Sequence, residues 1–211
     1  MTKSWRRGVW VAAGLCWLGV VGAGMAMVME YDTKPGAPAE APLVWPEASR
    51  VDLAPDRPTL IMFAHPRCDC TRASLSELAE LLARATERPR SYVVFIKPAQ
   101  TGAAWEQTAV WKQASGIPGI GVLRDDYGDE AKRFGVRTSG QTMMFLPDGR
   151  LAFSGGTTSA RGKTGLSIGR TTLLDLLDGR PASTFTAPVY GCPLFGPADA
   201  AEPAGEHPHV Q

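Results

Sequence analysis

The sequence lacks an excess of either charge, since 22 Lys and Arg residues stand against 21 Asp and Glu residues and leave a net charge of +1. A nucleic-acid partner is therefore disfavoured, because nucleic acids are bound by strongly basic surfaces. The sequence also has no internal repeat. Cysteine and histidine are scarce, at 4 and 3 of 211 residues, so a cluster of them carries information about function.

Charge is absent from residues 8–29, an apolar run that is long enough for the roughly 20 residues that span a bilayer. Lys3, Arg6 and Arg7 precede this run, and positively charged flanks stay in the cytoplasm. We expect residues 1–7 to be cytoplasmic and residues 8–29 to form a single transmembrane anchor in the inner membrane. The remainder of the chain is then expected in the periplasm.

A cleaved signal peptide is the alternative, because Gly24-Met25-Ala26 has small residues at the spacing of a cleavage site. Cleaved segments have apolar cores of only about 7–15 residues, which favours the anchor. In both cases the later cysteines are exported to a compartment where disulfides persist. Cys16 lies inside the apolar run without the preceding small residue that lipoprotein processing requires, and we expect an inert membrane thiol.

Composition divides the exported part into three. Residues 30–50 are rich in proline and alanine and predict an extended linker. Residues 51–196 alternate apolar runs with helical patterns and predict the folded domain. Residues 197–211 have little apolar content and predict a disordered tail, in which His207 and His209 are better explained as solvated side chains than as metal ligands.

Helices and buried strands alternate along the folded domain, which predicts an α/β sandwich. Continuous apolar runs indicate buried strands, whereas leucines at helical spacing indicate an amphipathic helix. The expected strands are residues 60–63, 92–96, 121–123, 142–146 and 151–153, and the expected helices are residues 71–87, 105–114, 130–134 and 169–177.

The segment His65-Pro66-Arg67-Cys68-Asp69-Cys70-Thr71 follows the first apolar run and opens the first helix. A helix N-terminus carries unpaired N–H groups and partial positive charge, which favour thiolate over thiol. A thiolate at this place is either a redox nucleophile or a metal ligand.

The stretch FAHPRCDCTRASLSEL resembles the active-site segment of the thioredoxin family, and EAKRFGVRTSGQTMMFLPDGRLAFSGG resembles the second half of that family's fold. The order of the predicted elements is also that of a thioredoxin-like fold, with a central mixed sheet flanked by helices. The resemblance is closest to RedB-like bacterial proteins, which share an HPxCxC motif. It implies a membrane-tethered thiol-disulfide oxidoreductase without a cofactor, whose partners are a protein thiol or disulfide substrate and a redox donor.

The resemblance also assigns roles to individual residues. Cys68 takes the place of the family's attacking cysteine, whereas Thr71 takes the place of the resolving one. Gly140 stands where the family has a cis-proline that faces the substrate, so we expect Ser139 and Gly140 to bind substrate. A glycine there is also expected to present a free N–H group to a sulfur. His65 is the natural candidate for the base.

The resolving thiol is left with two candidates, Cys70 and Cys192. A disulfide between residues i and i+2 closes a small, strained ring, whereas Cys192 lies between Gly191 and Pro193 in a predicted tight turn. The loop of residues 155–162 is rich in glycine and carries Arg161; it predicts either an anion cradle or, with more weight, a loop that runs close to the cysteines.

Two other functions stay open. His65, Cys68, Cys70 and Cys192 offer one imidazole and three sulfurs, a set that suits Zn²⁺ or Cu⁺ and predicts a metal-binding or metal-delivery protein. Alternatively, Cys68 and Cys192 form a structural disulfide, Cys70 is a spare thiol, and the domain is a non-catalytic binding module.

Overall fold

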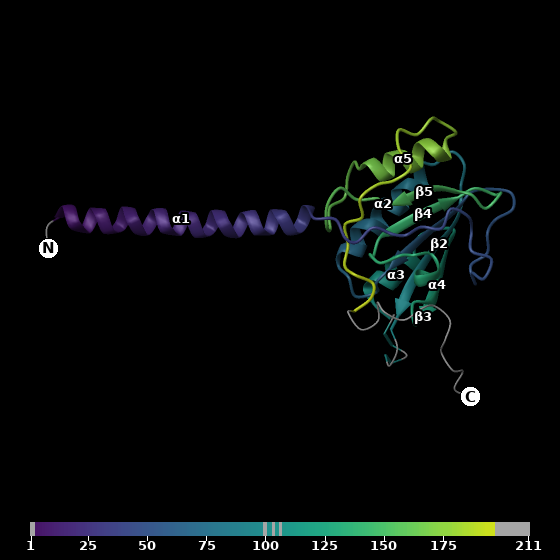
Figure 1. Cartoon of the computed structure of the whole chain (residues 1–211), viewed down its shortest axis with the longest axis horizontal. Coiled ribbons are helices and arrows are strands. Elements are labelled where there is room, and N and C mark those ends of the chain that lie inside the picture. Colours follow the sequence, from purple (N-terminus) through teal and green to yellow (C-terminus); the bar gives the residue numbers. More distant parts are fainter. Residues whose placement is uncertain (1–2, 99–100, 103, 106, 197–211) are drawn as a thin grey trace. The chain divides into compact units, whose positions relative to one another are not determined.

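The computed structural model describes residues 3–98, 101–102, 104–105 and 107–196 (Figure 1). The chain divides into two units, one that ends at Lys34 and one that begins at Pro35. The predicted tail of residues 197–211, with His207 and His209, lies outside the described residues.

The first unit is a single helix, α1 (Lys3–Thr33). Its stretch Arg7–Thr33 is long and apolar enough to cross a membrane. A signal sequence near an N-terminus has the same length and composition, so α1 could be either a membrane span or a signal sequence.

The second unit is a five-stranded mixed sheet flanked by helices, with the strand order β3-β2-β1-β4-β5 (Figure 1). In chain order its elements are β1 (Thr59–Ala64), α2 (Cys70–Arg84), β2 (Arg90–Lys97), α3 (Ala109–Ser115), β3 (Ile120–Asp126), α4 (Asp129–Arg133), β4 (Gln141–Phe145), β5 (Leu151–Gly155) and α5 (Ile168–Leu177). Strands β1, β2 and β3 are parallel, and β4 is antiparallel to both β1 and β5. This arrangement is the thioredoxin-like α/β fold expected from the sequence.

Both faces of the sheet are covered, which explains why its central strands consist of continuous apolar runs. Leu60 and Met62 of β1 pack with the apolar sides of α2, α3 and α5. Ile61 and Phe63 point to the opposite face and pack with Phe134, which follows α4. Strand β1 therefore lies at the centre of the core, and the chain leaves it directly into the cysteine segment.

Helix α2 owes its position to a leucine stripe at helical spacing, which is buried against the sheet. It begins at Cys70, one residue before the predicted start, and ends at Arg84. Helix α3 begins later than predicted, at Ala109, because the side chain of Thr108 accepts a hydrogen bond from the Trp111 amide at 3.2 Å and caps the helix there.

The structure differs from the predicted linker of residues 30–50, because the compact unit begins at Pro35 rather than at residue 51. Trp45 packs edge-on against Phe134 and Phe145, with ring centroids 5.1 and 5.0 Å apart. Its backbone amide donates a hydrogen bond to the carbonyl of Gly149 at 2.8 Å. A composition typical of linkers therefore forms a strap that covers one face of the sheet.

The strap also contacts the C-terminal part of the domain. The amide of Gly36 donates to the carbonyl of Val189 at 2.8 Å. The hydroxyl of Thr138 donates to the carbonyl of Ala37, also at 2.8 Å. Residues 36–37 are thus hydrogen-bonded both to Thr138, before β4, and to Val189, after α5.

Candidate functional site: a cluster of three cysteines

Cys68 lies at the junction between β1 and α2, and Cys70 is the first residue of α2. The loop between strand and helix is a tight one, in which the amide of Cys68 donates to the carbonyl of His65 at 3.2 Å and the amide of Thr71 donates to the carbonyl of Cys68 at 3.0 Å. The Cys68 residue is only 2% exposed. Its sulfur therefore sits in a partly desolvated place beside the N-terminus of a helix.

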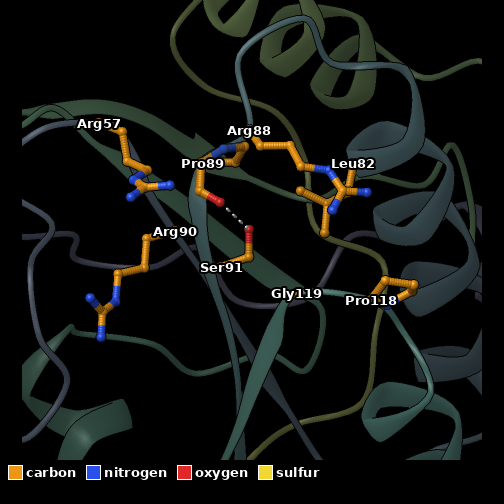
Figure 2. A pocket seen from close by; sticks show the side chains of 8 residues that line it. All are labelled: Arg57, Leu82, Arg88, Pro89, Arg90, Ser91, Pro118 and Gly119. Carbon is orange, nitrogen blue, oxygen red and sulfur yellow. Dashed lines mark hydrogen bonds between the residues drawn. The ribbon is translucent and has the colours of Figure 1, made fainter.

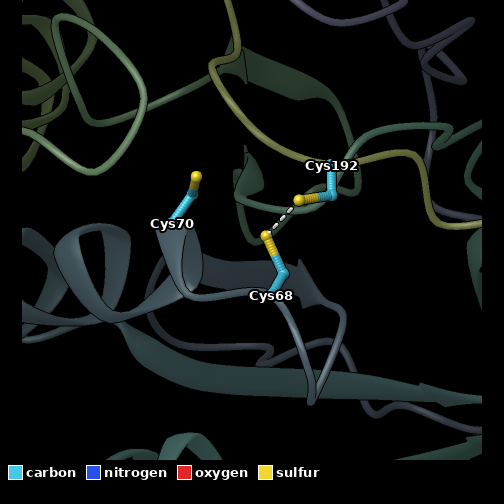
Figure 3. Close-up of side chains that lie close together, drawn as sticks. All are labelled: Cys68, Cys70 and Cys192. Atoms are coloured by element: carbon cyan, nitrogen blue, oxygen red, sulfur yellow. Dashed lines mark hydrogen bonds between the residues drawn. The ribbon is translucent and has the colours of Figure 1, made fainter. Parts of the chain in front are cut away.

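Cys192 joins these two residues from the C-terminal part of the domain (Figure 3). The sulfurs of Cys68 and Cys192 point toward each other and lie 2.7 Å apart, as a hydrogen-bonded pair of free cysteines. Cys70 completes the group, because the three Sγ atoms all lie within 4.8 Å of one another. Cys68 thus has a sulfur partner 124 residues away in sequence.

A short segment that we call the Cys192 arm, residues 190–194, holds Cys192 in place. It pairs in antiparallel fashion with the chain before β4 through a bridge between Thr138 and Pro193. The Ser139 amide donates to the Cys192 carbonyl at 2.9 Å, and the Leu194 amide donates to the Arg137 carbonyl at 2.9 Å.

Gly191 allows the arm to approach this closely. A Cβ atom on Gly191 would overlap the carbonyl oxygen of Ser139, so only glycine fits. On its other side the arm meets the glycine-rich loop, because Nη1 of Arg161 donates a hydrogen bond to the carbonyl of Gly191. The loop therefore runs beside the cysteines, which was the favoured expectation for it.

Ser139 connects the arm to the cysteine loop. Its hydroxyl accepts a hydrogen bond from the His65 amide at 2.9 Å and bonds the Thr71 hydroxyl at 2.8 Å. Ser139 and Thr71 are both buried. Thr71, which occupies the sequence place of the family's resolving cysteine, thus forms a buried hydrogen bond with Ser139.

Gly140 differs in one respect from the expectation. Its amide is not free to meet a sulfur, because it donates to the carbonyl of Phe63 at 2.8 Å. Its φ is +90°, a backbone angle that residues other than glycine rarely adopt. In the described part of the chain no peptide bond is cis, so Gly140 does not reproduce the family's cis-proline. Glycine is therefore needed for the backbone turn into β4, and the residue in hydrogen-bonding contact with the cysteine segments is Ser139.

The three thiols differ in acidity. Hydrogen bonds from the thiol and amide of Cys192, and from Thr71, outweigh burial and lower the pKa of Cys68 to about 5. The same hydrogen bond to Cys68, together with burial, raises the pKa of Cys192. Burial and the charge of Cys68 raise the pKa of Cys70. At neutral pH the group is therefore one thiolate, Cys68, with two thiols beside it.

His65 lies next to the cysteines but is not part of their cluster. Its Nδ1 accepts a hydrogen bond from the Arg67 amide at 3.1 Å, and its ring meets Trp105 edge-on with centroids 5.8 Å apart. Burial lowers the pKa of the imidazole, which keeps it neutral at pH 7. The guanidinium of Arg67 covers the Trp105 ring at 3.9 Å.

The residues present fit a thiophilic metal in part. Three sulfurs within 4.8 Å of one another match the soft ligands that Cu⁺ prefers. A structural Zn²⁺ site takes four ligands, and in the described part of the chain no His, Asp or Glu joins the three cysteines. Of the four metal ligands predicted from the sequence, the three cysteines lie together and His65 does not join them.

A separate cavity of about 320 Å³ lies at the opposite end of β1 and β2 (Figure 2). It is lined by Arg57, Leu82, Arg88, Pro89, Arg90, Ser91, Pro118 and Gly119. Arg57 and Arg90 are paired with Asp56 and Asp52, at 3.1 and 3.8 Å, so part of the positive charge there is already compensated. None of the residues predicted to carry the chemistry lines this cavity.

The sequence indicated Cys68, Cys70 and Cys192, and the structure brings these residues together. Sequence reasoning missed the role of Thr71, which carries no chemical signature and gains its role from the burial of its hydroxyl against Ser139. It also left Arg161 between two interpretations. The signal that favoured a loop near the cysteines was the absence of the strand, P-loop and lysine order of a phosphate site.

Comparisons with known proteins give a fold and no family. No family pattern matches the sequence, and no curated protein matches it. An uncharacterized conserved protein from Geobacillus kaustophilus has a similar structure, with a TM-score of 0.57 and 21% identity over 78% of this chain and 94% of that one. A hypothetical protein from Sinorhizobium meliloti 1021 is similar with a TM-score of 0.54 and 18% identity, over 76% and 93% of the two chains.

The exposed lipoprotein thioredoxin Etrx1 of Streptococcus pneumoniae is more distant, with a TM-score of 0.40 and 19% identity over 58% of this chain and 84% of that one. At these identities the similarities concern the fold. The resemblance to RedB-like proteins stays a prediction.

Proposed function

We propose that this protein is a thiol-disulfide oxidoreductase in which Cys68 attacks and Cys192 resolves. The observation that carries the proposal is the contact of 2.7 Å between the sulfurs of these two residues. A disulfide bond is about 2.05 Å long, so the two sulfurs need only a small approach when a client disulfide oxidises the pair. The low pKa of Cys68, about 5, supplies the thiolate that exchange requires.

The geometry favours Cys192 over Cys70 as the resolving thiol. Cys192 comes from a separate segment whose sulfur already faces that of Cys68, whereas Cys70 is two residues away on the same chain and would close a strained ring. His65 is proposed to tune the protonation of Cys68, since the two groups interact electrostatically. Contact of Ser139 and Gly140 with substrate stays a prediction, since both residues are buried and their amides already donate to Cys192 and Phe63.

The proposed exchange has two steps, an attack by Cys68 and then an attack by Cys192. The Cys68 thiolate attacks one sulfur of a client disulfide, forms a mixed disulfide and releases the other client sulfur as a thiolate. Cys192 then loses its proton and attacks the Cys68 sulfur, which forms the Cys68–Cys192 disulfide and releases the second client thiolate. Run in reverse, the same steps oxidise a client dithiol, so a separate redox partner sets the direction.

The test is a map of the thiols and disulfides of the full chain before and after treatment with a small-molecule disulfide. We expect a Cys68–Cys192 bond in the oxidised protein. Cys68→Ser should abolish exchange, whereas Cys192→Ser should accumulate the mixed disulfide. Unchanged exchange in Cys68→Ser would contradict the proposal.

The protein is further proposed to be held in the inner membrane by α1, with its N-terminus in the cytoplasm and its domain in the periplasm. Lys3, Arg6 and Arg7 support this orientation. An intact N-terminus in the membrane fraction, with a domain that external protease digests in spheroplasts, would support it. A mature chain that begins after Ala26 would show that α1 is a cleaved signal.

A copper or zinc protein is the second candidate, favoured by the three sulfurs within 4.8 Å of one another. It predicts stoichiometric metal in protein purified without chelator, which Cys68→Ser would remove. Because His65 lies outside the cluster, His65→Ala should leave the metal content unchanged. If neither exchange nor metal is found, the domain is a non-catalytic binding module.

A further inference from the structure

Arg161 is a charged residue at the cysteine cluster that the two-step exchange leaves unused. It lies in the loop between β5 and α5, and its guanidinium donates to the carbonyl of Gly191, the residue before Cys192. The loop itself is fixed, because the Ser167 hydroxyl donates to the Thr157 carbonyl and the Gly165 amide donates to the Glu77 carboxylate, both at 2.7 Å. Arg161 therefore reaches the Cys192 arm from a well-anchored loop.

The charges around Cys192 come from three segments of the domain. Cys68 and Cys70, in the loop before α2 and at its start, disfavour a Cys192 thiolate, and the positive charge of Arg161 favours it. On the chain before β4, the guanidinium of Arg137 is paired with Glu40 at 3.0 Å. Arg161 is thus the cation whose charge favours ionisation of the resolving thiol.

The groups that favour or oppose ionisation of the Cys192 thiol change in charge during the reaction. In the resting state the hydrogen bond to Cys68, burial and the negative charge of Cys68 keep the proton on Cys192. Once Cys68 is in a mixed disulfide its sulfur is neutral, so the strongest influence that keeps the proton on Cys192 is gone. The charge of Arg161 stays, and in a partly desolvated place it acts more strongly than in water.

We propose that Arg161 is the positioning residue of the resolving step: it holds Gly191 so that the Cys192 sulfur faces Cys68, and it stabilises the Cys192 thiolate that attacks the mixed disulfide. This inference rests on the proposed function. It concerns the second step alone, because the attack by Cys68 precedes the formation of the Cys192 thiolate.

Two substitutions separate the charge of Arg161 from its hydrogen bond. Arg161→Gln keeps a donor for the Gly191 carbonyl and removes the charge, whereas Arg161→Lys keeps the charge. Lys163→Gln is the matched control, since it removes an exposed positive charge from the same loop. All variants are made in the full chain in detergent, in a Cys16→Ser, Cys70→Ser background in which Cys68 and Cys192 are the remaining thiols.

The probe is 2,2′-dithiodipyridine, a neutral disulfide that releases a chromophoric thione at each step. The first equivalent reports the attack by Cys68 and the second reports resolution by Cys192. We expect Arg161→Gln to leave the first phase unchanged and to slow the second about threefold to tenfold at pH 7. The range follows from a loss of thiolate of about tenfold per pKa unit, partly offset by the higher nucleophilicity of a more basic thiol.

The pH dependence of the second phase separates an electrostatic role from a merely structural one. For Arg161→Gln its midpoint should move to higher pH, while Arg161→Lys and Lys163→Gln should behave like the parent. A parental second phase in Arg161→Gln, or equal slowing in Gln and Lys variants without a shift in midpoint, would overturn the inference. Release of the first equivalent at the parental rate by a Cys68→Ser protein, in which Cys192 is the remaining thiol, would instead contradict the proposed function itself.

Discussion

The amide of Ser139 donates a hydrogen bond to the carbonyl of Cys192 at 2.9 Å. The same residue bonds Thr71 and the amide of His65 through its hydroxyl. Ser139 is therefore the point at which the cysteine loop and the Cys192 arm are joined. The acidity of Cys68 depends on that junction, because the hydrogen bonds that stabilise its thiolate come from both sides of it.

The rate at which iodoacetamide alkylates Cys68 should follow ionisation of its thiol. Because the pKa is lowered to about 5, the rate should be constant above about pH 6 and fall as the pH drops through 5, where the thiolate takes up a proton. Cys192→Ala removes the main hydrogen bond and should move the midpoint upward by one unit or more. An unchanged midpoint in Cys192→Ala would show that another group sets the acidity.

Gly191→Ala should release the Cys192 arm without removing a functional group. The added Cβ would overlap the carbonyl of Ser139, so the arm cannot keep its hydrogen bonds. We expect a higher pKa of Cys68 and a Cys68–Cys192 disulfide that forms at least tenfold more slowly, measured by alkylation and mass spectrometry.

The control for this variant is Gly116→Ala. Gly116 has a φ of −83°, and its new Cβ would lie no closer than 3.4 Å to any atom. It should leave both the acidity and the disulfide unaffected. If Gly191→Ala also behaves like the parent, the arm is not held in the way described.

Trp45→Ala should destabilise the domain by roughly 3 kcal/mol, because it removes an aromatic ring from its contacts with Phe134 and Phe145. Urea unfolding followed by far-ultraviolet circular dichroism measures the change. Leu43→Ala alters the same strap at a side chain that is 79% exposed and should have no effect. Equal stability of the two variants would indicate that residues 35–50 are a linker after all.

A buried ion pair ties α2 to α5. Arg170 and Glu77 are 2.6 Å apart and are both almost fully buried. Removing one partner leaves an uncompensated buried charge, so Arg170→Met should cost about 3–5 kcal/mol in the free energy of unfolding. Replacing both residues, as Arg170→Met with Glu77→Leu, should recover much of that loss, and a double variant no more stable than the single one would contradict this explanation.

Much of the fold follows from local patterns in the sequence. The leucine stripe of α2 has the period of a helix, and the apolar runs of β1 and β2 are short enough to indicate buried strands. The Pro-Asp-Gly turn fixes the pairing of β4 with β5. The strap could not be predicted in this way, because proline and alanine are as frequent in an extended strap as in a linker. Trp45 was the residue that distinguished the two, since an aromatic ring of that size is costly to leave in water.

The site was harder to predict than the fold. Cys68 was identifiable from its place at a strand-to-helix junction. The choice between Cys70 and Cys192 as its partner stayed open, because Cys192 lies in a segment without periodicity. It is placed by backbone hydrogen bonds of its segment to Arg137 and Ser139, which have no signature of their own. The amide of Gly140 illustrates the same limit, since its bond to Phe63 depends on how β4 meets β1.

The strap gives the domain a mechanical property. The bonds from Gly36 to Val189 and from Thr138 to Ala37 tie the first residues of the compact unit to the chain that leads into the Cys192 arm and to the residue that pairs with it. Tension applied to the chain at Pro35 is therefore borne first by these two bonds, to residues that adjoin the Cys192 arm. A pull at this end therefore reaches the residues beside the Cys192 arm before it reaches the sheet.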